Sequence, residues 1–147
     1  MSQKMISSFR GEHAFLSNMY ASPIICEGET YLTVENAFQA AKTLDLSERK
    51  ELFSSSSPYS AKQQGRKVQL RRDWEQVKLP IMKQLIFRKF HSNPSLIEKL
   101  LTTKDATLIE GNTWGDTFWG MDTRKGGENH LGIILMDVRD MLESCRS

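Results

Sequence analysis

The chain has 147 residues, of which 39% are hydrophobic and 26% are charged, an ordinary size and composition for one globular domain. Its formal net charge of +2 is too small to indicate binding to nucleic acid or to a membrane surface, although it is compatible with a local basic pocket.

The cellular compartment is indicated by the N-terminus and the cysteines. The opening MSQKMISSF lacks the apolar run of a signal peptide, and no stretch reaches membrane-spanning length. Cys26 and Cys145 have no short spacing and no neighbouring ligand pattern, which favours free thiols in a reducing compartment. We therefore expect a cytoplasmic protein in which residues 1–147 form a single compact domain; the oligomeric state and the role of Cys26 stay open.

The first elements expected along the chain are short strands followed by a helix. In SPIICEGETYL, Glu27–Gly28 supplies turn residues between two brief β-prone runs, which predicts a β-hairpin. Thr33 is a suitable N-cap for a helix over VENAFQAAKTL. The apolar positions at helical spacing, which we expect to be buried, are Val34, Ala37, Phe38, Ala41 and Leu44. A second face of this helix carries Glu35, Gln39 and Lys42 at i, i+4 and i+7.

The middle of the chain reads as helices separated by prolines. A serine-rich loop, Ser54–Ser57, leads to Pro58, which opens a helix that runs through Lys62, Gly65 and Arg66. Asp73 and Gln76 have the spacing of a capping box for another helix.

Proline also marks the next two boundaries. Pro80 is expected to interrupt the pattern and to start a new helix that carries Ile81, Leu85 and Phe90. Asn93–Pro94 then gives a cap and a first-turn proline for a helix over SLIEKLL.

The last helix has the clearest period. Its apolar stripe consists of Leu131, Ile134, Leu135, Val138, Met141 and Leu142. Across the chain, the expected core includes Phe38, Ala41, Ile81, Leu85, Leu131, Leu135 and Val138. The fold class that follows is α+β and helix-dominated, a single compact domain with a small β-hairpin region near the N-terminus.

The segment EGNTWGDTFWG, residues 110–120, has neither a helical nor a strand period. It places Trp114 and Trp119 on either side of Asp116. Because an indole prefers a site with one apolar side and one polar side, the segment fits the wall of a pocket for a flat, polar ligand. The alternative is that the two indoles seal the edge of the core while Asp116 caps a turn.

Other types of site have little support. His13, His91 and His130 lie in three different segments without paired spacing, so no metal site is expected. The chain has no G-x-G-x-x-G motif, no phosphate-binding Walker loop and no serine in a nucleophile elbow.

Carboxylates therefore remain as the candidates for chemistry. Glu35 could be an ordinary ion-pair partner on a solvated helix face, as Asp116 could be a turn residue. Further polar residues lie beside apolar ones, at Ser17–Asn18 and at Asn129, and together these favour a pocket with a few placed polar contacts.

Five segments in the same order resemble the NADAR family, the YbiA-like N-glycosidases. They are FLSNMY, YLTVENAFQAAK, DWEQVKLPIM, LLTT…LIEGNTWGDTFWG and GENHLGIILMDVR, from about Phe9 to Arg139. The resemblance implies a YbiA-like fold and hydrolysis of a bond between C1′ of ribose and the nitrogen of a base-like amine. It points to phosphoribosylamino-pyrimidine and phosphoribosylamino-uracil intermediates of riboflavin synthesis as substrates, with ribose 5-phosphate and the free base as products.

The residue types fit that chemistry. Breaking the C1′–N bond builds positive charge on C1′, which a carboxylate stabilises, and a carboxylate can also align the attacking water. The resemblance thus makes Glu35 and Asp116 the expected catalytic pair, sharing one pocket. The expected substrate-binding residues are Asn18, Lys42, Arg66, Trp114, Trp119 and Asn129, with Lys62 a weaker candidate for the phosphate. No cofactor or metal ion is implied.

Two alternatives stay open. One is an ADP-ribosyl hydrolase that acts on ADP-ribosylated guanine in nucleic acid, for which GRKVQLRR, residues 65–72, is the only dense basic run. The other is a module that binds ADP-ribose or a nucleotide without catalysis. Two carboxylates at the matching positions favour an enzyme, because they would oppose simple binding of an anionic sugar phosphate.

Overall fold

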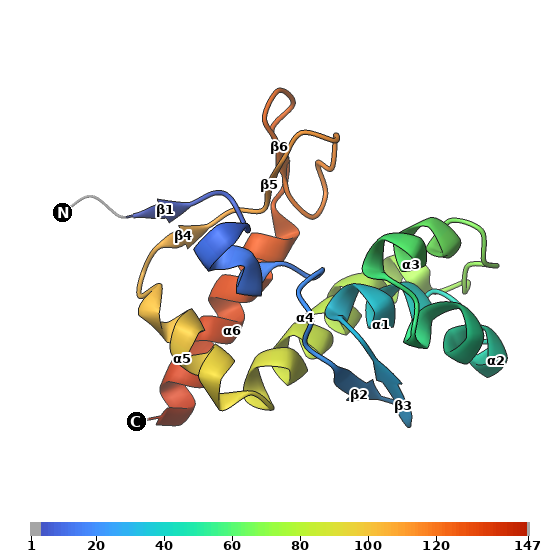
Figure 1. The fold of residues 1–147 in the computed structure, drawn as a ribbon. Coiled ribbons are helices and arrows are strands. Elements are labelled where there is room, and N and C mark those ends of the chain that lie inside the picture. Colours follow the sequence, from blue (N-terminus) through green and yellow to red (C-terminus); the bar gives the residue numbers. More distant parts are fainter. Residues whose placement is uncertain (1–3, 147) are drawn as a thin grey trace. The chain divides into compact units, whose positions relative to one another are not determined.

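A computed structural model of the chain describes residues 4–146 (Figure 1). The first three residues of the N-terminal stretch considered above lie outside this range. The chain divides into two units: unit 2 is continuous, from Asn18 to Lys89, whereas unit 1 combines the segment that ends at Ser17 with the segment that begins at Phe90.

Unit 2 begins with a hairpin. Strands β2 (Ile24–Cys26) and β3 (Glu29–Tyr31) pair antiparallel. The residues between them, Glu27 and Gly28, have φ angles of 50° and 83°. Two successive positive φ angles are those of a tight hairpin turn whose twist matches that of the strands. The predicted hairpin is therefore confirmed.

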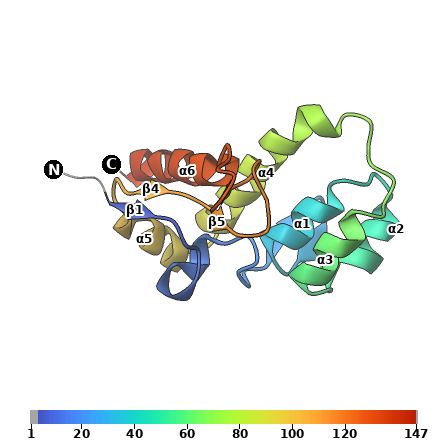
Figure 2. The same ribbon diagram turned by 90° about the horizontal axis from the view of Figure 1, so that it is seen from above.

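The helices of unit 2 follow in chain order. They are α1 (Val34–Ala40), α2 (Leu46–Glu48), the π-helical turn η2 (Arg49–Ser54), α3 (Pro58–Gly65) and α4 (Trp74–His91), whose last two residues belong to unit 1. Helix α1 packs on α3 and η2, as Figures 1 and 2 show. Ser57 caps α3 by accepting a hydrogen bond from Ser60 N, and Pro58 occupies its first turn, as predicted.

Two expectations for unit 2 are wrong. Pro80 does not start a helix, because α4 runs through it. Pro80 and Gln76 are both exposed, so the carbonyl group of Gln76, which loses its partner at the proline, can be hydrated. Leu44 is 64% exposed rather than buried, because α1 ends at Ala40 and the helical period ends with it.

The remaining features of unit 2 agree in part with expectation. Phe38 and Leu85 are buried, and the ring of Phe38 lies 5.0 Å from that of Trp74. Ala41 and Ile81, expected in the core, are only partly buried. Helix α4 begins at the expected place, but both carboxylate oxygens of Asp73 accept hydrogen bonds from Arg71, where a capping box was expected.

Unit 1 joins segments that are far apart in the sequence. Its elements are β1 (Met5–Ile6), the 3-10 helix η1 (Gly11–Leu16), α5 (Pro94–Thr102), β4 (Thr107–Leu108), β5 (Gly111–Asn112), β6 (Met121–Asp122) and α6 (His130–Arg146). Strand β1 pairs in parallel with β4, and β5 in parallel with β6. Helix α6 packs against β4 and α5.

The last helix confirms most of its predicted stripe. Leu131, Ile134, Leu135, Val138 and Leu142 are buried, but Met141 is 42% exposed, so its place in the core was wrong. The helix-dominated α+β class with a small N-terminal hairpin is confirmed, whereas one domain over residues 1–147 stays a prediction. Among the described residues, no helix is long and apolar enough to cross a membrane.

Candidate active site

The first turn of α1 places Glu35. Thr33 caps the helix as predicted, because its Oγ1 accepts a hydrogen bond from Asn36 N at 3.1 Å. Asn36 is fully buried, and its Nδ2 donates to Phe53 O at 2.7 Å and Ser56 O at 2.8 Å. These bonds tie the start of α1 to η2 and to the loop after it, so Glu35 is held on a rigid segment.

The polar face of α1 forms a charged cluster with α3. Gln39 Nε2 donates to Glu35 Oε2 at 2.6 Å. The pKa of Lys42 is lowered, chiefly by burial, and further by the positive charges of Arg66 and Lys62, while Glu35 opposes the shift. One carboxylate and three cations are thus gathered in unit 2, and three of the expected site residues, Glu35, Lys42 and Arg66, are brought together.

Asn18 has a structural role near this cluster. Its backbone carbonyl accepts a hydrogen bond from Glu35 N at 3.1 Å, which satisfies one of the N–H groups at the start of α1. Its side chain is buried, with Nδ2 located 3.5 Å from Met82 Sδ. The contact between Asn18 and a ligand stays a prediction.

In unit 1, Asp116 shapes the turn that contains the tryptophans. Its Oδ1 accepts hydrogen bonds from Phe118 N at 3.1 Å and Trp119 N at 2.9 Å. Asn112 fastens the same turn, since its Oδ1 accepts from Asp116 N and its Nδ2 donates to Asp116 O. The turn-capping alternative for Asp116 therefore describes its contacts, while its catalytic role stays a prediction.

The two tryptophans of this segment differ in their surroundings. Trp119 is partly buried, and its ring packs edge-on against Phe118, with 4.8 Å between the centroids. Trp114 is 55% exposed. Trp119 is thus partly enclosed, whereas more than half of Trp114 is open to solvent.

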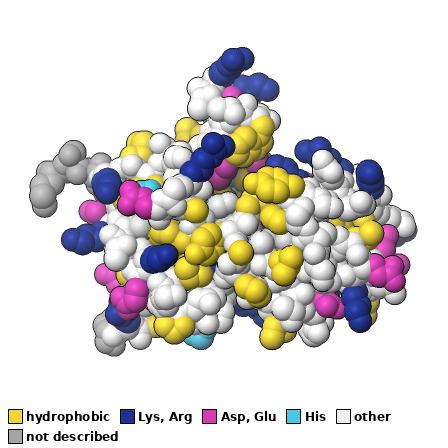
Figure 3. Space-filling view, in the orientation of Figure 1, with side chains coloured by type: hydrophobic (Ala, Val, Ile, Leu, Met, Phe, Trp, Pro, Cys, Tyr) yellow, Lys and Arg dark blue, Asp and Glu magenta, His cyan; other side chains and the backbone are white. Residues whose placement is uncertain are grey.

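Asp122 is a buried carboxylate that sequence reasoning missed. Its Oδ2 accepts from Gly115 N at 2.8 Å, and its Oδ1 accepts from Arg124 N and Lys125 N. These backbone hydrogen bonds lower the pKa of Asp122. The carboxylate thereby joins the turn after Trp114 to the exposed basic turn between β6 and α6, where Figure 3 shows Lys and Arg side chains at the outer end.

Asn129, expected to bind substrate, links backbone segments of unit 1. Its Oδ1 accepts from Glu110 N and its Nδ2 donates to Leu108 O, each at 3.0 Å. The side chain is 6% exposed. Both ends of its amide are thus used within unit 1, and a ligand contact for Asn129 stays a prediction.

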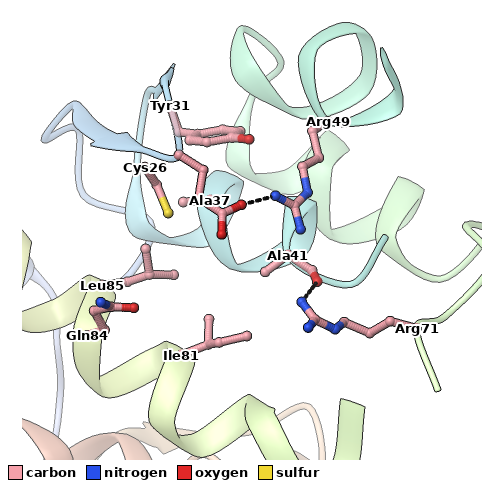
Figure 4. Close-up of a pocket in the computed structure, with 10 residues that line it drawn as sticks. Cys26, Tyr31, Ala37, Ala41, Arg49, Arg71, Ile81, Gln84 and Leu85 are labelled. Atoms are coloured by element: carbon pink, nitrogen blue, oxygen red, sulfur yellow. Dashed lines mark hydrogen bonds and ion pairs between the residues drawn. The ribbon is translucent and has the colours of Figure 1, made fainter. Parts of the chain in front are cut away.

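A small cavity lies on the other face of α1 (Figure 4). It measures about 50 Å³ and is lined in part by Cys26, Tyr31, Arg49 and Arg71. Arg49 pairs with Glu27 and donates to Thr43 O, while Arg71 donates to Ala41 O. Burial raises the pKa of the Cys26 thiol. The cavity is too small for a nucleotide and its cations are engaged, so it is not the candidate site.

Comparison with known proteins identifies the family. The family model of the NADAR domain matches residues 6–143. The chain belongs to the NADAR domain family. The N-glycosidase YbiA of Escherichia coli (strain K12) is 38% identical over 133 residues, which cover 89% of this chain and 82% of that protein.

A solved structure and one further relative extend the comparison for this NADAR-family chain. The NMR structure of E. coli YbiA matches with a TM-score of 0.86 at 35% identity, covering 99% of this chain and 89% of that one, which confirms the YbiA-like fold. A riboflavin biosynthesis protein of Vibrio vulnificus is 32% identical over 133 residues, covering 89% of this chain but 36% of that protein. The expected enzyme class, an N-glycosyl hydrolase, is confirmed by the family and by the name of the E. coli relative.

The cluster in unit 2 has chemistry suited to this class. A carboxylate can stabilise positive charge at a sugar carbon, and the nearby cations can hold an anionic group of the substrate. Between residues 4 and 146, no group of three or more His, Cys, Asp and Glu side chains is placed to hold a metal ion. Sequence reasoning placed Gln39 beside Glu35 but gave it no role, although its i, i+4 spacing was a signal for the contact.

Proposed function

We propose that this NADAR-family chain hydrolyses the C1′–N bond of phosphoribosylamino-pyrimidine and phosphoribosylamino-uracil compounds and releases ribose 5-phosphate. The observation that supports it is the position of Glu35 in a cluster with Lys42, Lys62 and Arg66. One carboxylate among three cations suits a substrate that has an anionic phosphate and a carbon that becomes positive during the reaction. The name of the longer Vibrio relative, a riboflavin biosynthesis protein, agrees with this substrate class.

In the proposed reaction, water supplies a hydroxyl group to C1′ and a proton to the leaving nitrogen. As the C1′–N bond breaks, positive charge spreads over C1′ and O4′, and the carboxylate of Glu35 stabilises it. Glu35 also orients the water for attack. All the charges that this reaction needs come from side chains, so the proposal includes neither a metal ion nor a cofactor.

The cations account for the phosphate in this proposal. Arg66 and Lys62 both lower the pKa of Lys42, because adding a positive charge beside them is unfavourable. A phosphate group bound there would offset that repulsion and favour the charged form of Lys42. The stacking of Trp114 on a flat base, expected from the resemblance, stays a prediction.

A substrate panel tests the proposal. The purified chain is incubated with phosphoribosylamino-pyrimidine, phosphoribosylamino-uracil and ADP-ribosylated guanosine, free and within an oligonucleotide. Mass spectrometry then detects the released base and sugar, with and without a chelator. We expect ribose 5-phosphate from the first two compounds at the same rate in EDTA. Release of ADP-ribose alone would favour the ADP-ribosyl hydrolase, and activity lost in EDTA and restored by a divalent ion would contradict the metal-free mechanism.

Replacement of Glu35 tests the mechanism. Glu35→Gln keeps the size of the side chain and one acceptor oxygen but removes its charge. We expect kcat to fall by on the order of a hundredfold, the scale of losing a positioned electrostatic group or general base, while the protein still folds. The matched control is Glu75→Gln on α4, where the exposed carboxylate pairs with Lys78. A folded Glu35→Gln protein with wild-type turnover on a confirmed substrate would refute the role of Glu35.

A further inference from the structure

Gln39 is a buried amide with only one of its two ends satisfied. Its side chain lies on α1, one turn after Glu35, and the residue is 5% exposed. Nε2 donates to Glu35 Oε2 at 2.6 Å. Oε1 is buried, and within residues 4–146 no donor reaches it. The contact with Glu35 is therefore the polar interaction that orients this side chain.

The orientation of the amide follows from its neighbour. If nitrogen and oxygen were exchanged, Oε1 would face the Oε2 atom of Glu35, and two acceptors would lie at hydrogen-bonding distance without a proton between them. The N–H group must therefore point to the carboxylate. A buried carbonyl without a donor lowers the stability of the fold. The side chain of Gln39 thus makes its contact with Glu35 at a cost in stability.

Helix α3 confines the amide from the other side. A Cβ atom added at Gly65 would lie 1.9 Å from Gln39 Oε1 and 2.8 Å from its Cδ. The absence of a side chain at Gly65 thus gives the amide its space. Gln39 is held between the backbone of α3 and the carboxylate of Glu35.

We infer that Gln39 is a positioning residue. Through the hydrogen bond from Nε2 to Oε2, its amide keeps the carboxylate of Glu35 ionised and directed toward the substrate. The inference rests on the proposed catalytic role of Glu35. The charged groups near this pair include Lys42, on which Glu35, Arg66 and Lys62 act electrostatically. Because the amide is neutral, its hydrogen bond fixes the direction of the carboxylate without adding a further charge beside it.

Gln39→Met is the first test. Methionine keeps the length and the helix propensity of glutamine, but removes both the donor and the unsatisfied carbonyl. We expect kcat to fall about tenfold with KM nearly unchanged, on the scale of one lost hydrogen bond to a charged group. We also expect the acid limb of the pH–rate profile to move to higher pH, because an ionised carboxylate that loses its donor takes up a proton more readily. The melting temperature should stay equal or rise.

A structural role for Gln39 predicts the opposite pattern. A lower melting temperature with unchanged kcat and an unchanged acid limb would overturn the inference. The matched control is Gln63→Met, at an exposed position on α3, which should leave the kinetics and the pH profile as they are.

Gly65→Ala is an independent test that leaves Gln39 in place. The added methyl group would overlap the end of a flexible side chain, so the fold can adapt by moving the amide away from Glu35. We expect the same loss of kcat and the same change in the acid limb. If Gln39→Met does not fold, this variant decides the question, and wild-type kinetics in a folded Gly65→Ala protein would overturn the inference.

The double variant separates this inference from the proposed function. In a Glu35→Gln protein, adding Gln39→Met should cause no further loss of kcat, because the carboxylate to be positioned is already absent. If Glu35→Gln is inactive while Gln39→Met has wild-type kcat, only the positioning role fails. If Glu35→Gln itself is fully active, the proposed role of Glu35 fails first.

Discussion

At the scale of single residues, the acidic side chains of this NADAR-family chain divide by the partners they have. Asp122 accepts hydrogen bonds from three backbone N–H groups, which lower its pKa. Asp116 accepts two backbone N–H groups with one oxygen, Oδ1. Glu35 instead contacts a side-chain amide and acts electrostatically on a lysine. A carboxylate with many backbone partners holds the chain together, whereas the position of Glu35 among polar side chains agrees with its proposed role.

Asp116→Asn distinguishes these two functions at one position. Asparagine keeps an Oδ1 that can accept from Phe118 N and Trp119 N, so the turn and the stability should be retained. If the charge of Asp116 serves catalysis, kcat should fall by on the order of a hundredfold. The measurement is turnover on a confirmed substrate together with thermal unfolding. Asp122→Asn is the contrast, because its NH₂ group would face one of the backbone donors, and that variant should lose stability. Unchanged turnover in Asp116→Asn would leave Asp116 with a structural role only.

Local spacing predicted one part of the candidate site, whereas the rest was expected only through the family resemblance. The Thr33 cap and the i, i+4, i+7 spacing placed Glu35, Gln39 and Lys42 on one face. Lys62 and Arg66 join them only because α3 packs on α1, and no local spacing encodes that packing. Similarly, an asparagine does not reveal in sequence whether its amide faces a ligand or, as with Asn129, bridges backbone segments.

At the scale of elements, α6 anchors unit 1. Leu135 is 1% exposed in the middle of this helix. Leu135→Ala should lower the free energy of unfolding by roughly 2–5 kcal/mol, through lost apolar burial and the cavity left behind. The measurement is denaturant unfolding. Met141→Ala on the same helix is the control, because Met141 is 42% exposed and should cost within about 0.5 kcal/mol. Equal stability of the two variants would contradict the burial of Leu135.

Helix boundaries show where local rules suffice. Thr33 and Ser57 cap α1 and α3 with their own side chains, which a sequence can predict. Pro80 shows the limit of such rules, because a proline ends a helix only if the hydrogen bond that it removes cannot be replaced. Gln76 and Pro80 lie on the exposed side of α4, where water can replace that hydrogen bond, and buried residues such as Met82 and Leu85 keep the helix packed. Packing that involves distant residues therefore decides such boundaries.

At the scale of the whole molecule, Lys89 makes stability depend on pH. It is 1% exposed, and burial lowers its pKa from 10.5 to about 7. Between these two values the unfolded chain binds a proton at Lys89 that the folded chain does not bind. The free energy of unfolding should therefore rise with pH across this window, by up to about 1.4 kcal/mol per pH unit from this one group.

Lys89→Met should remove that contribution. Denaturant unfolding of the wild type and the variant from pH 6 to pH 10 measures it as the difference between their slopes. Lys83→Met, at an exposed position on the same helix, should keep the wild-type slope. Identical pH dependence in Lys89→Met and the wild type would show that Lys89 keeps an ordinary pKa in the folded chain.

The pairing of β1 with β4 has a consequence for the order of events on the ribosome. Met5 and Ile6 pair with Thr107 and Leu108, so the first strand has no partner until most of the chain has been translated. All residues of unit 2, by contrast, can leave the ribosome before Thr107 and Leu108 do, because unit 2 ends at Lys89. Domains fold as units, and earlier parts of a nascent chain can fold first. Unit 2 can therefore form while the apolar side chains of the N-terminal segment still lack their packing partners from the C-terminal part of unit 1. A nascent chain stalled after Lys89 has left the exit tunnel, but before β4 has, would thus expose Ile6, Phe9, Phe15 and Leu16, the side chains that a chaperone would have to shield.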